Sequence, residues 1–492
     1  MDNLSFKPNS LPFESEDHKT RLYVSDFYRN AVVLVTGGTG FVGKVLVEKL
    51  LRSFDVRKIY ILLREKRNVS PPERLKQLIK DPIFETIRRT IIHHDALFAK
   101  LEAVEVDFTV DEFVKEPLKT DLLNNTQIVF HVMGNVSFNK SLQTSLESNV
   151  NSAERLYTFI RNAKNLQSIV HVSTFYSNCD RPYIEEMIYD DIPFGGLDNV
   201  RRILKPLSET EEAALTPAIL GTIPNSYIFS KKSAEVMIQK QFSELPIGIF
   251  RPPIVGPSFE EPVPGWVDCF QSLTGLSVPI IEHRFLRYYG DPNATSDIVP
   301  VDYCVSAIIT AACDIRARYD QRKVLETVDK TPPSVPVYNF TFDKQRVTWQ
   351  QFLAFVGKSL PSAIDRTLSP LRVRITKRRI LSWISFCLFY LQAYLADFIL
   401  GIFKRPKCHV RTILSLDLLH QATEYFLCHA WTSRNDNIKR MRSLLSKEEE
   451  TLLEFDVDRI EWKEYYNRFV AGLMNFLERK RKSRRERNRT AC

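Results

Sequence analysis

One stretch near the N-terminus constrains the fold more than any other. Residues 31–36 form an apolar, β-branched run, and Gly37, Gly40 and Gly43 follow it at intervals of three. Apolar residues at helical spacing then continue to Leu51. This order predicts a buried parallel strand, a tight turn and the start of a helix. Backbone N–H groups and the helix dipole favour an anion there, so the turn suits a dinucleotide pyrophosphate, although such glycine spacing also occurs in ordinary turns.

Further strand-like stretches follow at the rhythm of alternating strands and helices. They are residues 58–63, 103–108, 127–132 and 168–173. A helical pattern over residues 142–163 precedes the last of them. We therefore predict the α/β class, with a Rossmann-like doubly wound parallel sheet that helices cover on both faces.

The end of the second predicted strand distinguishes between nicotinamide cofactors. A carboxylate there would bind the ribose 2′-hydroxyl of NAD, whereas an arginine pairs with the 2′-phosphate of NADP. This chain has Arg64 at that position, with Lys66 and Arg67 close behind. The residues favour NADPH, and the alternative is an ordinary solvated charge in a loop.

Candidate catalytic groups follow the last predicted strand and begin a later helix. Ser173 and Thr174 end the strand at residues 168–173, at the edge where such sheets bind ligands. Tyr227 and Lys231 are four residues apart, so they share one face of a helix. A nearby ammonium stabilises a phenolate, which makes a tyrosine useful in proton transfer. Such pairs are common on surface helices, but the glycine turn and the strand-end hydroxyls favour the catalytic interpretation.

Composition limits the compartment and the partners. The 492 residues carry a net charge of +9, and the eight cysteines show no paired spacing. We therefore expect a reducing, cytosol-facing environment with no metal site. The basic tail at residues 479–492 suits an anionic membrane surface or a simple solubilising end. We expect no nucleic-acid partner, because no recognition motif accompanies that tail.

A long apolar run occupies residues 380–403, between basic residues on both sides. It is long enough to cross the ~30 Å hydrocarbon core of a bilayer. Asp397 opposes a simple span, because a carboxylate at a helix centre costs ~2.5–3.5 kcal/mol, although it lies near the end of the run where headgroups are accessible. We expect membrane association, with a span and a monotopic insertion both open. The alternative is a hydrophobic hairpin or buried helix that packs on the protein.

Together these motifs resemble the alcohol-forming fatty acyl-CoA reductases, within the extended short-chain dehydrogenase/reductase superfamily. The segments that carry the likeness are residues 35–43, 171–178, 224–231, 251–255, 264–268 and 297–302, with an aromatic-rich helical C-terminal region. The resemblance implies that NADPH reduces a long-chain acyl-CoA to an alcohol in two hydride transfers through an aldehyde. Tyr227 would be the proton donor, Lys231 would tune its pKa, and Thr174 or Ser173 would polarise the carbonyl.

The resemblance also implies a cofactor site and a domain organisation. The implied cofactor residues are Gly37, Thr39, Gly40, Phe41, Val42, Gly43, Arg64, Asp107, Tyr227 and Lys231. The predicted segments are an N-terminal extension (1–29), a reductase domain with a smaller substrate region (30–345), a connecting helical segment (346–379), the apolar segment (380–403), a C-terminal helical domain of the male-sterility type (404–478) and the basic tail (479–492).

Some positions depart from the family pattern and keep other functions open. The departures are Val106, Met133-Gly134-Asn135, Cys269 and Glu282-His283-Arg284. None of them is Thr174, Tyr227 or Lys231. The alternatives are another membrane-bound extended dehydrogenase, acting on steroids or nucleotide sugars, and a catalytically silent membrane scaffold. We expect the endoplasmic reticulum membrane first and the peroxisomal membrane second, and the sequence makes no prediction of oligomeric state.

Overall fold

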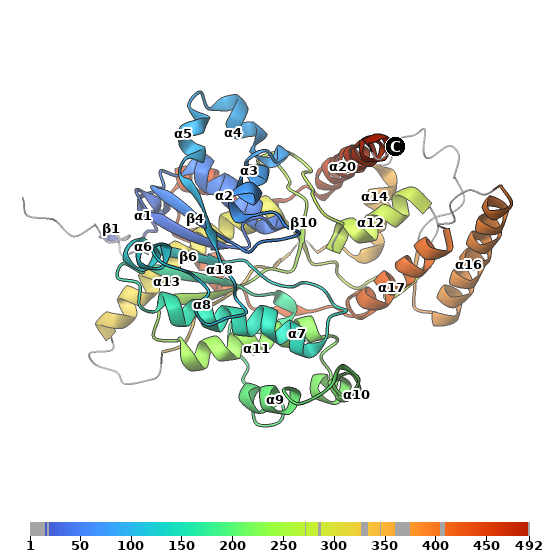
Figure 1. Cartoon of the computed structure of the whole chain (residues 1–492), viewed down its shortest axis with the longest axis horizontal. Helices are drawn as coiled ribbons and strands as arrows, with labels where there is room; N and C mark the ends of the chain where they lie inside the picture. Colours follow the sequence, from blue (N-terminus) through green and yellow to red (C-terminus); the bar gives the residue numbers. More distant parts are fainter. Residues whose placement is uncertain are drawn as a thin grey trace, which may run out of the picture. The chain divides into compact units, whose positions relative to one another are not determined.

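The computed structural model describes residues 15–16, 19–270, 272–283, 287–325, 333–344, 346–359, 374–403 and 409–490 (Figure 1). Backbone contacts divide the chain into two compact units. The first unit comprises Met1–Pro253, Asp302–Thr341 and Ser433–Phe455. The second comprises Ile254–Val301, Phe342–Thr432 and Asp456–Cys492. Of the departures noted above, Arg284 lies outside the described residues.

A seven-stranded sheet forms the centre of the first unit. Its order is β13-β9-β7-β6-β3-β4-β5, and every neighbouring pair is parallel. The strands are β3 (Val32–Thr36), β4 (Lys58–Leu63), β5 (Leu101–Glu105), β6 (Ile128–His131), β7 (Ser168–Val172), β9 (Ile247–Arg251) and β13 (Val337–Asn339). Because the chain moves outward from β3 in both directions, the switch point lies between β3 and β6, where doubly wound sheets bind ligands. This confirms the predicted fold class.

Helices cover both faces of this sheet. The main ones are α2 (Phe41–Ser53), α3 (Pro71–Ile79), α6 (Leu118–Asn125), α7 (Leu142–Leu146), α8 (Ser152–Ile160), α9 (Leu197–Leu204), α10 (Glu209–Leu220), α11 (Ser226–Gln241) and α13 (Val301–Leu325). Shorter ones are α1 (Val24–Tyr28), α4 (Glu85–Thr90), α5 (His94–Phe98), α18 (Asp436–Ser443) and α19 (Lys447–Leu452). One apolar cluster joins alternate strand residues such as Leu34 and Ile169 to α8 and α11. On the opposite face, Ile315 of α13 fills the space above Gly248 of β9.

Besides β9, which the sequence analysis does not predict, two details differ from the predicted elements. The helix predicted over residues 142–163 is interrupted by a π-helical turn, η2 (Glu147–Asn151), between α7 and α8. The third strand runs over Leu101–Glu105, so Asp107 lies beyond its end and not within it. For both the helix and the strand, the apolar pattern predicted that the element exists. The pattern did not predict where its regular hydrogen bonding ends.

The second unit is mainly helical. Its helices are α12 (Ser272–His283), α14 (Trp349–Lys358), α16 (Arg379–Ile402), α17 (His409–Cys428) and α20 (Trp462–Thr490). Two short parallel pairs accompany them, β10 (Ile254–Gly256) with β12 (Ile298–Pro300) and β11 (Arg287–Tyr289) with β14 (Arg374–Thr376). Among the described residues, α16 is the helix that is long and apolar enough to cross a membrane.

Candidate active site

The glycine turn joins β3 to α2 at the switch point of the sheet. Gly37 has a φ of +74°, and a Cβ atom there would lie 2.7 Å from the backbone nitrogen of Met133. A Cβ atom on Gly43 would lie 2.2 Å from the Gly37 carbonyl oxygen, so the turn tolerates no side chain at either position. Gly40 is the N-cap of α2, and Phe41 and Val42 begin the helix. A helix N-terminus that side chains leave open is the geometry that accommodates a pyrophosphate.

Two arginines meet beside this turn. Arg64 is exposed directly after β4, as the sequence predicts, and Arg74 reaches it from α3. The Arg74 guanidinium donates to the Arg64 carbonyl oxygen at 2.6 Å and to the Thr39 hydroxyl at 2.9 Å. Partial burial, followed by repulsion from Arg64, lowers the pKa of Arg74. Two arginine charges near enough for one to lower the pKa of the other form an environment that favours an anion.

Asp107 lies in the loop after β5 and is bonded within that loop. Its Oδ1 accepts hydrogen bonds from the Thr109 backbone at 3.0 Å and from the Thr109 hydroxyl at 2.7 Å. These hydrogen bonds, with the field of Arg64 as a smaller effect, lower the pKa of Asp107. The Asp107 carboxylate therefore stabilises its own loop through hydrogen bonds. Its contact with a cofactor stays a prediction.

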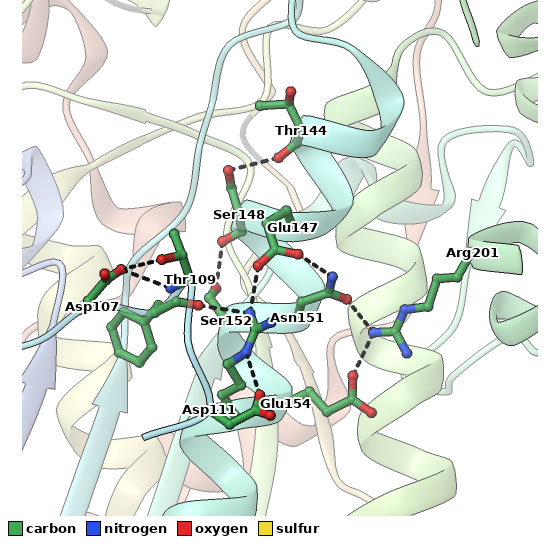
Figure 2. A network of polar contacts seen from close by, with 12 residues as sticks. Asp107, Thr109, Asp111, Thr144, Glu147, Ser148, Asn151, Ser152, Glu154 and Arg201 are labelled. Atoms are coloured by element: carbon green, nitrogen blue, oxygen red, sulfur yellow. Dashed lines mark hydrogen bonds and ion pairs between the residues drawn. The ribbon is translucent and has the colours of Figure 1, made fainter. Parts of the chain in front are cut away.

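A polar network fastens that loop to the π-helical turn (Figure 2). Arg155 donates to the Phe108 carbonyl oxygen at 2.8 Å and to Glu147 at 2.6 Å. Glu147 also accepts from Asn151, and Arg201 of α9 donates to Asn151 at 2.6 Å. In Figure 2, Asp107 and Arg201 approach the turn from opposite sides. The loop after β5 thereby shares one framework with α8 and α9, two of the helices that precede α11.

Tyr227 and Lys231 occupy the first two turns of α11. The side chain of Asn225 caps this helix by accepting a hydrogen bond from the Ile228 backbone at 2.9 Å. Tyr227 is partly accessible to solvent, whereas Lys231 is 3% exposed. The Lys231 ammonium donates to the Val172 carbonyl oxygen at 2.9 Å, at the end of β7.

The surroundings set the proton affinities of these groups. Burial raises the pKa of Tyr227 to about 12, although the Thr174 hydroxyl beside it lowers that pKa. Burial lowers the pKa of Lys231 to about 8, against the attraction of Glu235. Tyr227 therefore carries its proton at neutral pH, which is the form that a proton donor needs. The site brings Thr174, Tyr227 and Lys231 together at the carboxyl end of β7.

Ser173 has a different environment from Thr174. Its hydroxyl donates to Glu235 at 2.5 Å, and the Ser177 hydroxyl donates to the same carboxylate at 2.9 Å. Glu235 also forms a bidentate ion pair with Arg251, at 3.0 and 2.6 Å, and both residues are fully buried. Ser173 is thus engaged beneath the site, which leaves Thr174 as the better placed hydroxyl for a carbonyl.

Asn149 lies next to the candidate site, and the sequence analysis did not single it out. It lies in the π-helical turn and is buried, and its Oδ1 accepts from the Asn135 backbone at 2.7 Å. Its amide donates to Ser230, the neighbour of Lys231, at 2.8 Å. A π-helical turn is frequent at functional sites, but an apolar pattern does not reveal one. Arg74 was missed for a similar reason, because a charge on an exposed helix has no distinctive sequence signal.

Comparisons with known proteins find relatives along nearly the whole chain. Two family models, both described as male sterility protein, match residues 35–308 and 388–480. Fatty acyl-CoA reductase 1 of Xenopus laevis is 31% identical over 470 residues, which covers 93% of this chain and 86% of that protein. The human protein of the same name is 29% identical over 467 residues, with 92% and 86% covered.

Solved structures support the fold. The reductase domain of a nonribosomal peptide synthetase from Mycobacterium tuberculosis superposes with a TM-score of 0.60 at 16% identity, over 91% of this chain and 92% of that one. The family model spans more than half of the chain, and the relatives align along nearly all of it. The chain therefore belongs to the fatty acyl-CoA reductase family.

Proposed function

We propose that this protein reduces long-chain fatty acyl-CoA to fatty alcohol, with NADPH as the reductant. The observation that carries the proposal is the grouping of Thr174, Tyr227 and Lys231 at the end of β7, in the same unit as the glycine turn. The names of the relatives suggest the acyl-CoA substrate. The first reduction releases the CoA thiol and an aldehyde, and the second converts the aldehyde to the alcohol.

The side chains have complementary tasks in each reduction. The bound cofactor supplies a hydride to the carbonyl carbon, and negative charge develops on the carbonyl oxygen. The Thr174 hydroxyl and the Tyr227 phenol stabilise that charge as hydrogen-bond donors. In the second reduction Tyr227 gives its proton to the alkoxide oxygen. In the first reduction the tetrahedral oxyanion collapses to the aldehyde, the C–S bond breaks, and the proton from Tyr227 ends on the CoA sulfur. The Lys231 ammonium one turn away stabilises the phenolate in both steps.

The arginine pair supports NADPH over NADH. Arg64 and Arg74 present two cations beside the turn, which suits the dianionic 2′-phosphate. The Arg74→Ala variant should raise the KM for NADPH by about 10–100-fold and leave the KM for NADH nearly unchanged. Arg89→Ala, at an exposed arginine of α4, is the matched control. Equal losses with both cofactors would contradict a 2′-phosphate role.

The reaction itself is tested on the purified full chain. We expect NADPH consumption with a C16–C18 acyl-CoA, and a fatty alcohol as the product by mass spectrometry. A steroid or nucleotide-sugar dehydrogenase would consume cofactor only with those substrates. A catalytically silent scaffold would bind lipid and consume nothing. Absence of alcohol across all chain lengths would refute the proposal.

The expected location follows from the chemistry of the product and from α16. A long-chain alcohol partitions into lipid, and α16 has the length and composition of a membrane-associated segment. We propose attachment to the endoplasmic reticulum membrane, with the peroxisomal membrane as the second candidate. Fractionation of cells that express the tagged protein, with markers for both organelles, distinguishes the two.

A further inference from the structure

The apolar side chains of α16 are mostly on its surface. Those exposed by more than half include Ile380, Trp383, Leu391, Tyr394, Phe398 and Ile402, which we call the apolar face. A narrow stripe on the other side of the helix is buried, and it contains Ser385, Ala393 and Asp397. A contiguous apolar surface of this kind requires a partner or a lipid phase.

The buried stripe packs against α17, and polar contacts fasten both ends of the pair. Asp397 accepts hydrogen bonds from the backbone of His409 at 3.0 Å and of Val410 at 2.9 Å. At the other end, Arg379 forms an ion pair with Glu424. The two helices are thus antiparallel along their length. Asp397, which the sequence suggested near the headgroups, instead caps the N-terminus of α17.

The partner helix is too polar to enter hydrocarbon. Along the same length α17 carries Arg411, Asp417, His420, Gln421 and Glu424. The His420 ring accepts a hydrogen bond from the Tyr289 backbone in β11, at 3.3 Å, and α17 also packs on α12. If α16 crossed a bilayer, these ionisable groups would be carried into the hydrocarbon core, where each is costly.

We infer that α16 and α17 form an in-plane hairpin, with the apolar face inserted into one leaflet of an anionic membrane and α17 on the water side. The inference rests on the membrane location proposed above. Arg378 and Arg411 are exposed near the two ends of the pair, where they can meet lipid phosphates. If α16 spanned the membrane, Arg378 and Arg411 would lie at opposite membrane surfaces. In the in-plane hairpin, the two arginines lie at the same membrane surface.

Vesicle binding by the full chain tests the surface. With vesicles of phosphatidylcholine and phosphatidylserine, Leu391→Glu/Leu395→Glu should reduce the bound fraction by about tenfold or more. The matched control is Ile92→Glu/Val110→Glu, which adds the same charges at exposed apolar residues of the first unit. Equal binding by the two variants, or no binding by the wild-type chain, would overturn the inference.

The depth of tryptophans distinguishes an in-plane hairpin from a span. Trp383 is 64% exposed, and Leu391→Trp or Ile402→Trp is introduced as a reporter into a Trp383→Phe background. That background keeps four other tryptophans, so its own quenching is measured and subtracted. We expect both reporters to be quenched best by lipids brominated near the headgroup. Deep quenching at position 391 with shallow quenching at 402 would indicate a span and overturn the inference. Because alcohol formation is measured separately in detergent, neither result bears on the proposed reaction.

Discussion

Helices α11 and α16 reverse the usual relation between hydropathy and burial. α11 contains two lysines, a glutamate and two serines in its central turns, yet Ile228–Ile238 are all buried. α16 is apolar along its length, yet only Ser385, Ala393 and Asp397 are buried among its residues. The polar helix carries the proposed chemistry, and the apolar helix carries the proposed contact with lipid.

The two helices differ in how an unfavourable environment is compensated. Charged groups inside α11 are tolerated because they are paired, as Glu235 is with Arg251, or because a carbonyl oxygen accepts from them, as Val172 does from Lys231. Exposed apolar area on α16 is tolerated only if something outside the chain covers it. Variants in the two helices should therefore affect different properties of the protein.

The largest effect is expected from Tyr227→Phe in α11. Removing the phenol hydroxyl eliminates the proton donor, so kcat for alcohol formation should fall by about 10²–10⁴-fold. The thermal unfolding midpoint serves as the control, because the ring itself is retained. Undiminished activity in the folded variant would favour another proton donor, and an unchanged cellular phenotype would favour the scaffold alternative.

Glu235→Gln should break the buried ion pair. The variant leaves the Arg251 guanidinium without its carboxylate, which should lower the free energy of unfolding by about 3–5 kcal/mol. Chemical denaturation measures this loss. The double variant Glu235→Leu/Arg251→Met removes both charges and should recover part of the loss, because Ser173 and Ser177 still lose their acceptor. A single variant as stable as the wild-type chain would show that the ion pair contributes nothing.

Lys231→Met should stabilise the fold while it removes activity. The fall in the pKa of Lys231 from 10.5 to about 8 corresponds to about 3 kcal/mol, and the lost hydrogen bond to Val172 offsets about 1 kcal/mol. The variant should therefore gain about 2 kcal/mol at pH 7. As pH rises from about 8 to 10.5, folded Lys231 loses its proton before the unfolded chain does, so the gain should shrink. A gain independent of pH would contradict this origin.

Asp397→Ala, in α16, should have the smallest effect on the free energy of unfolding. The variant removes the cap of α17, which should cost about 1 kcal/mol. Hydrogen exchange should accelerate in the first turn of α17 and remain unchanged in α11. Asp417→Ala is the control, because Asp417 accepts from Gln421 one turn later on the same helix and lies outside the first turn of α17. Equal acceleration in both variants would argue against the cap.

Features that depend on short segments of the chain could be predicted from the sequence. The glycine turn, the alternation of strands and helices, and the spacing of Tyr227 and Lys231 depend on short segments, and the structure confirms the α/β class that they predict. Contacts between segments that are distant in the sequence could not be predicted. The engagement of Ser173 with Glu235, 62 residues away, and of Asn149 with Ser230, 81 residues away, depends on packing that no local pattern encodes.

The hydropathy of α16 shows the same limit. Composition alone was compatible with a span, a monotopic insertion and a packed helix. It does not show which residues Asp397, the carboxylate within the apolar run, contacts. The partners of Asp397 are residues 409 and 410, beyond the end of the apolar run. An Asp that limits insertion on a hydropathy scale is, in three dimensions, a helix cap.

The order of synthesis gives the Asp397 cap a further role. During translation, α16 leaves the ribosome before α17, and its apolar side chains are then recognisable to the machinery that inserts spans. The partners of Asp397 follow only 12 and 13 residues later, whereas Glu424 follows Arg379 by 45 residues. The loop end of the hairpin can therefore close first, while most of α17 is still unmade. A single carboxylate near the end of the run would then commit the nascent helix to pairing with its neighbour before it is threaded across a bilayer.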